Sequence, residues 1–332
     1  MSTGLPASGT GTAASRPALS VFGFVDAVLR GVGQVMLQNS RYAGLLFVLG
    51  LAVASPMFAL AAVLGTAVST ATAAWLWVDR GQLRDGLFGF NGALVAIALL
   101  VFLQPTLLTW ACVVLAAVAS TVVTAASARL LKVWDVPPLT APFVLTSWCF
   151  FLATARLGRL EPTGLLPAAM LPKAATVDGV VTIATLAEGL FNGVSQVFFQ
   201  QSVIAGMLLT LGLFIGSWRA GVGALVGSLV GLLVAWWLGA AETAIRAGVF
   251  GFNSVLVAIA LGSTFRMPGR AALLYVLVAT VATVLVAAAV SAAVQPVGLP
   301  GLTLPFVLVT WVFLWARSAF RRLGAAEDAE QA

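Results

Sequence analysis

The stretch Gly86–Leu99, GLFGFNGALVAIAL, returns almost unchanged at Gly248–Leu261 as GVFGFNSVLVAIAL. The offset in numbering is 162 (248 − 86), and it aligns residues 29–99 with 191–261 without a gap, with 31 identities in 71 positions. Such identity indicates that the chain is a tandem duplication. Each copy carries one asparagine, Asn91 or Asn253, in otherwise apolar surroundings, and a polar amide at membrane depth typically marks a functional pathway.

Composition places the chain in a membrane. Of its 332 residues, 61% are hydrophobic and only 8% are charged, and the mean hydropathy is +1.07. This is more apolar surface than a soluble core of that size can hide. The apolar segments are long and lack the alternating pattern of outer-membrane strands. We therefore predict an all-α polytopic membrane protein.

Several function classes are excluded by what the sequence lacks. There is no histidine, and the two cysteines, Cys112 and Cys149, each lie in an apolar run, so neither a metal site nor a redox motif can be built from them. We find no nucleophile, base or metal cluster, and we expect no cofactor and no enzymatic activity. The basic residues are scattered among the connections, which argues against a nucleic-acid partner.

Each half begins with a segment that is too short and too polar to cross a bilayer, Asp26–Asn39 and Glu188–Gln201. We predict that both are re-entrant helices, with Gln34 and Gln38 on one helical face. An amphipathic helix at the membrane interface is the alternative. Five apolar spans follow in each half, at about 42–60, 60–78, 86–104, 106–131 and 139–157, and at about 203–218, 220–239, 248–264, 270–293 and 301–319.

Five spans are an odd number, so the second half must enter the membrane from the opposite side, as an inverted repeat. If both termini are cytoplasmic, the inner connections and tail carry ten basic residues and the outer ones carry four, which satisfies the positive-inside rule. We expect a multi-pass protein of the cell membrane, the inner membrane in a bacterium. The predicted divisions are a disordered cytoplasmic tail (1–21), the first repeat (22–157), a linker (158–187), the second repeat (188–320) and a cytoplasmic tail (321–332).

A further repeated motif opens each fifth span: residues 139–145 read LTAPFVL and residues 302–308 read LTLPFVL. Proline is favourable in the first turn of a helix, and a threonine two residues earlier can cap the backbone amides. Capping alone would explain Thr140 and Thr303. A capping hydroxyl can also face a pore, and inverted symmetry would bring these two to equivalent depths near the middle of the bilayer.

The polar and aromatic groups repeated in both halves are all uncharged. Amide and hydroxyl dipoles with aromatic walls suit a small neutral polar solute, whose faces pack on rings while its edges hydrogen-bond. The repeated pairs are Gln34 and Gln196, Phe90 and Phe252, Asn91 and Asn253, and Thr140 and Thr303.

Together, the paired FN-G/S-x-L, L-T-x-P-F and Q-V-x-x-Q segments and the two five-span halves resemble the urea transporter family, over about residues 22–320. The resemblance implies a homotrimer of channel-like protomers, each conducting urea by facilitated diffusion through its own pore between the halves. It also implies a ladder of oxygens at Gln34, Val35, Gln196 and Val197, aromatic slots at Leu37, Phe90, Phe199 and Phe252, lining by Leu94 and Leu256, central hydroxyls at Thr140 and Thr303, and support from Asn91 and Asn253. Leu37 stands where the family pattern has Phe, so that slot lacks one π-face.

Two alternatives remain open on the sequence. The same fold could pass short amides, ammonia or water. The chain could also be an ion-coupled secondary transporter, since inverted repeats and broken helices are common in that class, although it has no histidine and no acid deep in a span.

Overall fold

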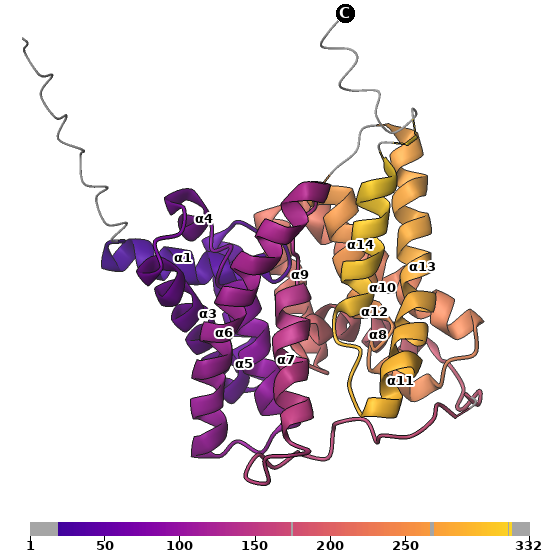
Figure 1. Cartoon of the computed structure of the whole chain (residues 1–332). Helices are drawn as coiled ribbons and strands as arrows, with labels where there is room; N and C mark the ends of the chain where they lie inside the picture. Colours follow the sequence, from indigo (N-terminus) through magenta and orange to yellow (C-terminus); the bar gives the residue numbers. More distant parts are fainter. Residues whose placement is uncertain (1–18, 174, 266–268, 318, 321–332) are drawn as a thin grey trace, which may run out of the picture.

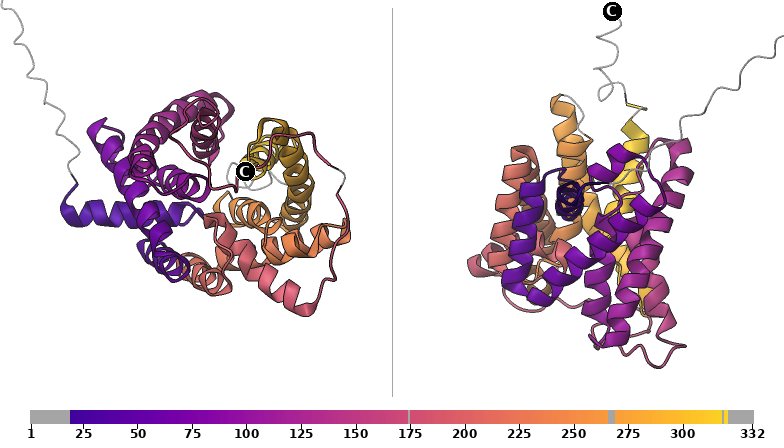
Figure 2. Two further views of the ribbon diagram at one scale, coloured as in Figure 1. Left: turned by 90° about the horizontal axis from the view of Figure 1, so that it is seen from below. Right: turned by 90° about the vertical axis from the view of Figure 1, so that its left-hand side faces the viewer.

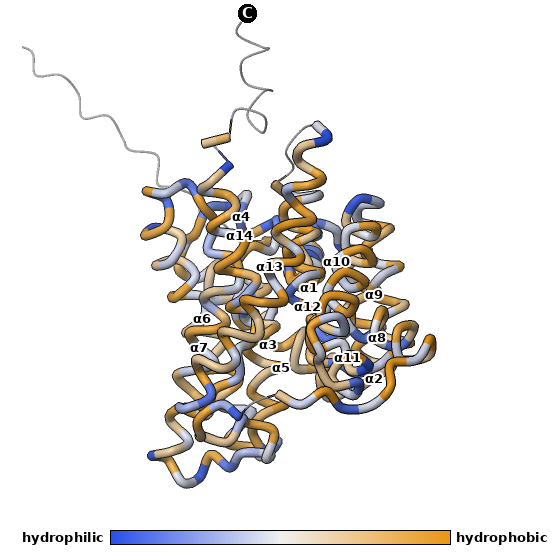
Figure 3. The backbone as a smooth tube through the Cα atoms, turned by 90° about the vertical axis from the view of Figure 1, so that its right-hand side faces the viewer, coloured by the Kyte–Doolittle hydropathy of each residue, from blue (hydrophilic) through white to orange (hydrophobic). Residues whose placement is uncertain are grey.

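The computed structural model describes residues 19–173, 175–265, 269–317 and 319–320. Within these ranges every named element is a helix, and the only extended pairing is an isolated bridge between Leu103 and Pro162. The all-α prediction is therefore confirmed (Figure 1). Figure 3 shows hydrophobic residues along most of the long helices, with hydrophilic residues mainly at their ends and in the connections.

The two copies fold into the same series of seven helices. The first copy contains α1 (Val21–Gln34), α2 (Arg41–Ala54), α3 (Pro56–Trp75), α4 (Arg80–Arg84), α5 (Phe90–Phe102), α6 (Leu107–Leu131) and α7 (Ala141–Ala153). The second contains α8 (Ile183–Ser195), α9 (Val203–Gly216), α10 (Trp218–Trp237), α11 (Glu242–Arg246), α12 (Gly251–Ile259), α13 (Arg270–Val294) and α14 (Leu304–Arg317).

Repeated caps begin the equivalent helices. The hydroxyl of Ser40 accepts a hydrogen bond from the amide of Ala43 at the start of α2, and Ser202 does the same for α9, both at 3.3 Å. Ser55 and Ser217 cap α3 and α10 in the same way. A serine oxygen in this position satisfies an amide that has no partner within the helix. The helix starts therefore follow from residues that the duplication kept.

One inserted residue is absorbed as a π-helical turn. Up to Leu261 the copies align at an offset of 162, whereas α6 and α13 align at 163 (270 − 107). The extra residue falls within Ala260–Thr264, which is π-helical, and the amide of Phe265 bonds to the carbonyl of Ala260 at 2.7 Å. A π-turn is how a helix accommodates one additional residue without ending.

Not every predicted span is long enough to cross a bilayer alone. Among the described residues, five helical segments have the length and hydropathy of a span, whereas four further apolar helices, α2, α5, α7 and α14, are shorter. At 1.5 Å per residue these shorter helices extend about 20 Å, against about 30 Å of hydrocarbon. The structure supports several membrane-spanning helices, and the count of ten crossings stays a prediction.

The two segments predicted to be re-entrant are helices that begin five residues earlier than expected, at Val21 and Ile183, so α8 starts inside the predicted linker. Figure 2 shows α1 lying across the direction of α6 and α7. The helix formed by α8 and its 3₁₀ extension meets α9 at 74°, with a break of at most four residues. The prediction that Gln34 and Gln38 share a helical face is wrong, because α1 ends at Gln34.

The halves pack face to face through α2 and α9. The ring of Phe47 on α2 lies edge-on to Phe198, with centroids 5.8 Å apart. Gly50 and Gly212 are equivalent positions, and each faces the partner helix: a Cβ on Gly50 would meet Leu209 of α9, and one on Gly212 would meet Phe47 of α2. In Figure 1 the segment after α7 runs along the bottom, whereas α14 ends near the top.

Close backbone approach fixes α1 against α2 and α8 against α9. A Cβ at Gly44 would overlap the carbonyl oxygen of Leu29, and a Cβ at the equivalent Gly206 would overlap that of Phe191. We predict that Gly44→Ala and Gly206→Ala each destabilise the protein by about 1–3 kcal/mol, because helix backbone, unlike a side-chain tip, cannot move aside cheaply. Thermal unfolding in detergent measures this.

The matched control for this prediction is Gly158→Ala, because no atom lies within 4 Å of a Cβ built at Gly158. Its unfolding midpoint should stay close to that of the parent protein. Equal midpoints for Gly44→Ala, Gly206→Ala and Gly158→Ala would show that the close approach does not stabilise the fold.

Candidate functional site

The two central threonines meet. The hydroxyl oxygens of Thr140 and Thr303 are 2.7 Å apart, so one donates a hydrogen bond to the other, and each residue is 2% exposed. The interpretation of Thr140 as a helix cap is wrong: it occupies the N-cap position of α7, but its side chain makes no capping hydrogen bond. Two hydroxyls that share one hydrogen bond keep lone pairs free to accept from a solute.

The side chain that caps α7 comes from Asn91 instead. Its Oδ1 accepts a hydrogen bond from the backbone amide of Phe143 at 3.2 Å, and its Nδ2 donates to the carbonyl of Leu139 at 3.3 Å and to Thr124 Oγ1 at 3.2 Å. Leu139 has a positive φ of 50°. Asn91 is fully buried, and its side chain holds the start of α7.

Asn253 makes the equivalent hydrogen bonds in the second copy. Its Oδ1 accepts from the amide of Phe306 at 3.2 Å, and its Nδ2 donates to the carbonyl of Leu302 at 3.3 Å. Leu302 has the same φ of 50° as Leu139. Ala287 occupies the position equivalent to Thr124 (287 − 163 = 124) and therefore cannot accept a hydrogen bond from Asn253.

Tryptophans exchange hydrogen bonds between the halves. The indole Nε1 of Trp148 on α7 donates to the carbonyl of Pro300 at 2.9 Å, and Trp311 on α14 donates to the carbonyl of Pro137 at 2.8 Å. The two tryptophans occupy equivalent positions, as do the two prolines, so each copy contacts the other through the same residues. Reciprocal contacts of this kind are the mark of a two-fold relation between units.

A cavity of about 500 Å³ lies beside the Thr303 end of this centre. Its lining includes six of the seven second-copy residues that the sequence predicted: Gln196, Val197, Phe199, Phe252, Asn253 and Thr303. Leu256, the seventh, is fully buried and does not line this cavity. The cavity also touches Phe102 of the first copy and Pro167 of the linker.

In the first copy Phe90 and Gln34 are buried, whereas their equivalents Phe252 and Gln196 are only partly buried. Leu94 is fully buried, Val35 is 2% exposed and Phe90 is 8% exposed. Gln34 is 9% exposed, and its Nε2 donates to the backbone carbonyl of Asp85 at 2.9 Å. The side chain of Gln34 is therefore committed to a structural contact in this conformation, unlike the cavity-lining Gln196.

The turns after α1 and α8 place Leu37 and Phe199. Both residues have a positive φ of 60°. This backbone conformation is uncommon for residues other than glycine. The ring of Phe199 lies edge-on to Phe102 and Phe143, with centroids 6.1 and 6.2 Å away. Phe199 of the second copy thus packs against two rings of the first copy, and the aromatic slot at this residue stays a prediction.

Gln38 and Gln200 stabilise these turns. The Nε2 of Gln38 donates to the carbonyl of Met36 at 3.0 Å, and that of Gln200 donates to the carbonyl of Phe198 at 2.9 Å. These repeated glutamines therefore fold back onto the chain, and no pore contact is needed to explain them.

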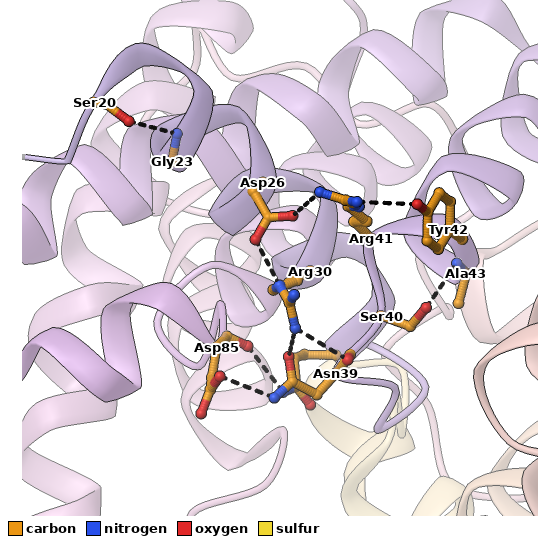
Figure 4. Close-up of polar contacts among 11 residues, drawn as sticks. Ser20, Gly23, Asp26, Arg30, Asn39, Ser40, Arg41, Tyr42, Ala43 and Asp85 are labelled. Atoms are coloured by element: carbon orange, nitrogen blue, oxygen red, sulfur yellow. Dashed lines mark hydrogen bonds and ion pairs between the residues drawn. The ribbon is translucent and has the colours of Figure 1, made fainter.

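Charged groups fasten the outer part of α1 (Figure 4). Arg30 pairs with Asp26 at 2.7 Å and donates to Asn39 Oδ1 at 2.7 Å, and Asn39 in turn donates to Asp85 Oδ1 at 2.9 Å. In the second copy Arg246 pairs with Glu188 at 2.9 Å and with Glu242 at 2.7 Å. Asp26, Glu188 and Glu242 are thus held in ion pairs, and Asp85 accepts a hydrogen bond from Asn39.

The sequence did not point to the tryptophan pair, nor to the cavity residues Ser291 near the end of α13 and Gln295 directly after it. Trp148 and Trp311 could have been found, because each follows the proline of the repeated L-T-x-P-F motif, Pro142 or Pro305, by six residues. Ser291 and Gln295 line the cavity but have Ala128 and Lys132 as their equivalents. The repeat therefore gave no signal for them.

Comparison with known proteins gives the family of the chain. A family model described as "Urea transporter" matches residues 25–318. The chain is 32% identical over 295 residues to urea transporter 1 of Ovis aries, covering 88% of this chain and 76% of that protein. It is 30% identical over 298 residues to urea transporter 1 of Rattus norvegicus, covering 89% and 77%.

The match extends from α1 to the end of α14 and includes every residue of the candidate site. It also bears out the exclusion of enzymes, because members of the matched family are transporters or channels. The chain is a multi-pass membrane protein that belongs to the urea transporter family.

Proposed function

We propose that the chain conducts urea by facilitated diffusion through a narrow uncharged passage between two inverted halves. The observation that carries this proposal is the meeting of Thr140 and Thr303, 2.7 Å apart, at the place where α7 and α14 begin. A solute that crosses here meets hydroxyl, amide and aromatic groups. None of the residues predicted for the passage is charged.

The reciprocal bonds of Trp148 to Pro300 and of Trp311 to Pro137 support the inversion of the repeats. So does the course of the chain in Figure 1, where α7 and α14 run in opposite directions. With an axis through the Thr140–Thr303 pair, the second half is the first half turned over in the membrane. The repeats proposed are 22–157 and 188–320.

The chemistry of urea fits such a passage. Urea has two NH2 groups and one carbonyl, and removing its water costs several kcal/mol unless acceptors replace it. In this mechanism the backbone oxygens at Gln34, Val35, Gln196 and Val197 take over hydrogen bonds from one another as the solute advances, and the threonines supply acceptors at the centre. Leu94 and Leu256 close the remaining wall.

The proposed setting is a homotrimer in the cell membrane with both termini in the cytoplasm. The distribution of basic residues among the connections supports this orientation. The trimer rests on the resemblance to the family. Crosslinking in native membranes tests the trimer, and protease access to the C-terminus tests the orientation.

Removing both central hydroxyls should slow transport. We predict that the Thr140→Val and Thr303→Val double variant lowers urea flux about five-fold, the equivalent of one lost hydrogen bond of about 1 kcal/mol in the rate-limiting barrier. Stopped-flow light scattering of proteoliposomes measures the flux. The double variant is preferred because a single change leaves the other hydroxyl buried without its partner.

Thr283→Val is the matched control for this change. Thr283 is buried on α13, where its hydroxyl donates to the carbonyl of Ala279 at 2.7 Å, so the same isosteric substitution is made outside the passage. Its flux should stay near the parent value. If the double variant and the control carry urea equally well, the threonines do not form the central site.

The unequal slots should control selectivity. We predict that Leu37→Phe increases the preference for urea over acetamide and that Phe199→Leu decreases it, because a flat amide stacks on a ring and a methyl-bearing one fits a tight slot poorly. Competition of labelled urea by acetamide and formamide measures the preference. Identical competition curves for both variants would contradict the assignment of Leu37 and Phe199 as slots.

A further inference from the structure

A second cavity is the counterpart of the first in the other copy. It has a volume of about 420 Å³ and lies between the ends of α6 and α14. Six of its nine lining residues are equivalent, at the offset of 163 that relates α6 to α13, to residues that line the 500 Å³ cavity. These pairs are Phe265 and Phe102, Ala128 and Ser291, Lys132 and Gln295, Val136 and Leu299, Pro137 and Pro300, and Pro138 and Gly301.

The equivalence makes these cavities the two mouths of the passage proposed above, and the inference rests on that function. One mouth, next to the segment that follows α7, is called here the linker-side mouth. The other, beside the end of α14, is called the Lys132 mouth. In Figure 1 the end of α14 and the segment after α7 lie at opposite ends of the molecule, so the mouths face opposite sides of the membrane.

The mouths differ in charge. The linker-side mouth is lined, among the described residues, by no Asp, Glu, Lys or Arg. The other is lined by Lys132, Arg317 and Asp135, a net charge of +1 (2 − 1). No ion pair described in the structure joins Asp135 to either base.

We propose that the Lys132 mouth repels cationic analogues of urea, whereas the linker-side mouth admits them as far as the neutral passage. Guanidinium is the informative probe, because it is planar and has the size of urea but carries a permanent charge. At the linker-side mouth guanidinium packs on the rings of Phe199 and Phe252 and keeps part of its water. The passage offers no counter-charge to replace the rest of that water, so guanidinium goes no further and blocks urea. The chain thereby distinguishes the two directions of approach for a cation but not for a neutral solute.

Sidedness of block tests this proposal. Guanidinium is added outside right-side-out and inside-out membrane vesicles that contain the full chain, and urea flux is measured in each. We expect its half-inhibitory concentration to be at least about two-fold lower from the linker side, as one net charge at a distance of about 8 Å predicts in water. Acetamide, which is neutral, should compete equally from both sides. About 1 M salt should remove the difference for guanidinium.

The duplication supplies matched variants. Lys132→Gln should lower the half-inhibitory concentration on the Lys132 side, and Gln295→Lys should raise it on the linker side, each by at least about two-fold. Arg219→Gln is the control, since Arg219 lies over Trp218 beside a groove of α10 and α13, away from both mouths. It should leave both values unchanged.

Three results would overturn the proposal while urea flux is intact: no inhibition from either side, equal inhibition from both sides in the parent protein, or the same change in Lys132→Gln and Arg219→Gln. A parent protein without urea flux would instead overturn the proposed function, and the inference with it. The two failures are therefore distinguishable in one experiment.

Discussion

The whole arrangement depends on satisfying backbone amides at two helix starts buried in the middle of the molecule. A helix that begins at membrane depth exposes amides that water cannot reach, and each unsatisfied group costs several kcal/mol. Asn91 and Asn253 solve this for α7 and α14, each bonding to a backbone amide on one side and to a backbone carbonyl on the other. Because the asparagines cap these starts, the threonine hydroxyls are free to face each other.

Because the chain is duplicated, the two capped helix starts also form an interface between the copies. Each copy presents a helix start, a tryptophan and a proline carbonyl, and the two copies exchange the same hydrogen bonds. Gly50 of α2 and Gly212 of α9 are likewise equivalent, and each allows close packing against the other helix. When two equivalent units contact each other through the same positions, every contact forms twice, once from each unit. The candidate site therefore lies where the two copies meet, which is the axis of the proposed inverted repeat.

Much of the fold could be predicted from the sequence, because repetition marks what both copies need. The serine caps, the helix series and the pairing of Thr140 with Thr303 all follow from residues present twice. The helix lengths could not be predicted, since hydropathy does not separate an apolar turn from an apolar helix, as at residues 86–89 before α5. The role of Gln38 was misjudged for a related reason: nothing in the sequence shows that α1 ends at Gln34.

Positions where the copies differ carry the remaining information. Thr140 meets its own equivalent, Thr303, so a substitution at either one would leave the other buried hydroxyl without its partner, and both positions are Thr. Positions away from the axis are free to differ, and they do so at Leu37 and Phe199, at Thr124 and Ala287, and at Lys132 and Gln295. Ala287 in place of Thr124 leaves Asn253 beside a cavity, whereas Asn91 is fully buried. In the proposed passage the centre is therefore constrained to be symmetric, and any difference between the two directions of approach must arise toward the two proposed mouths.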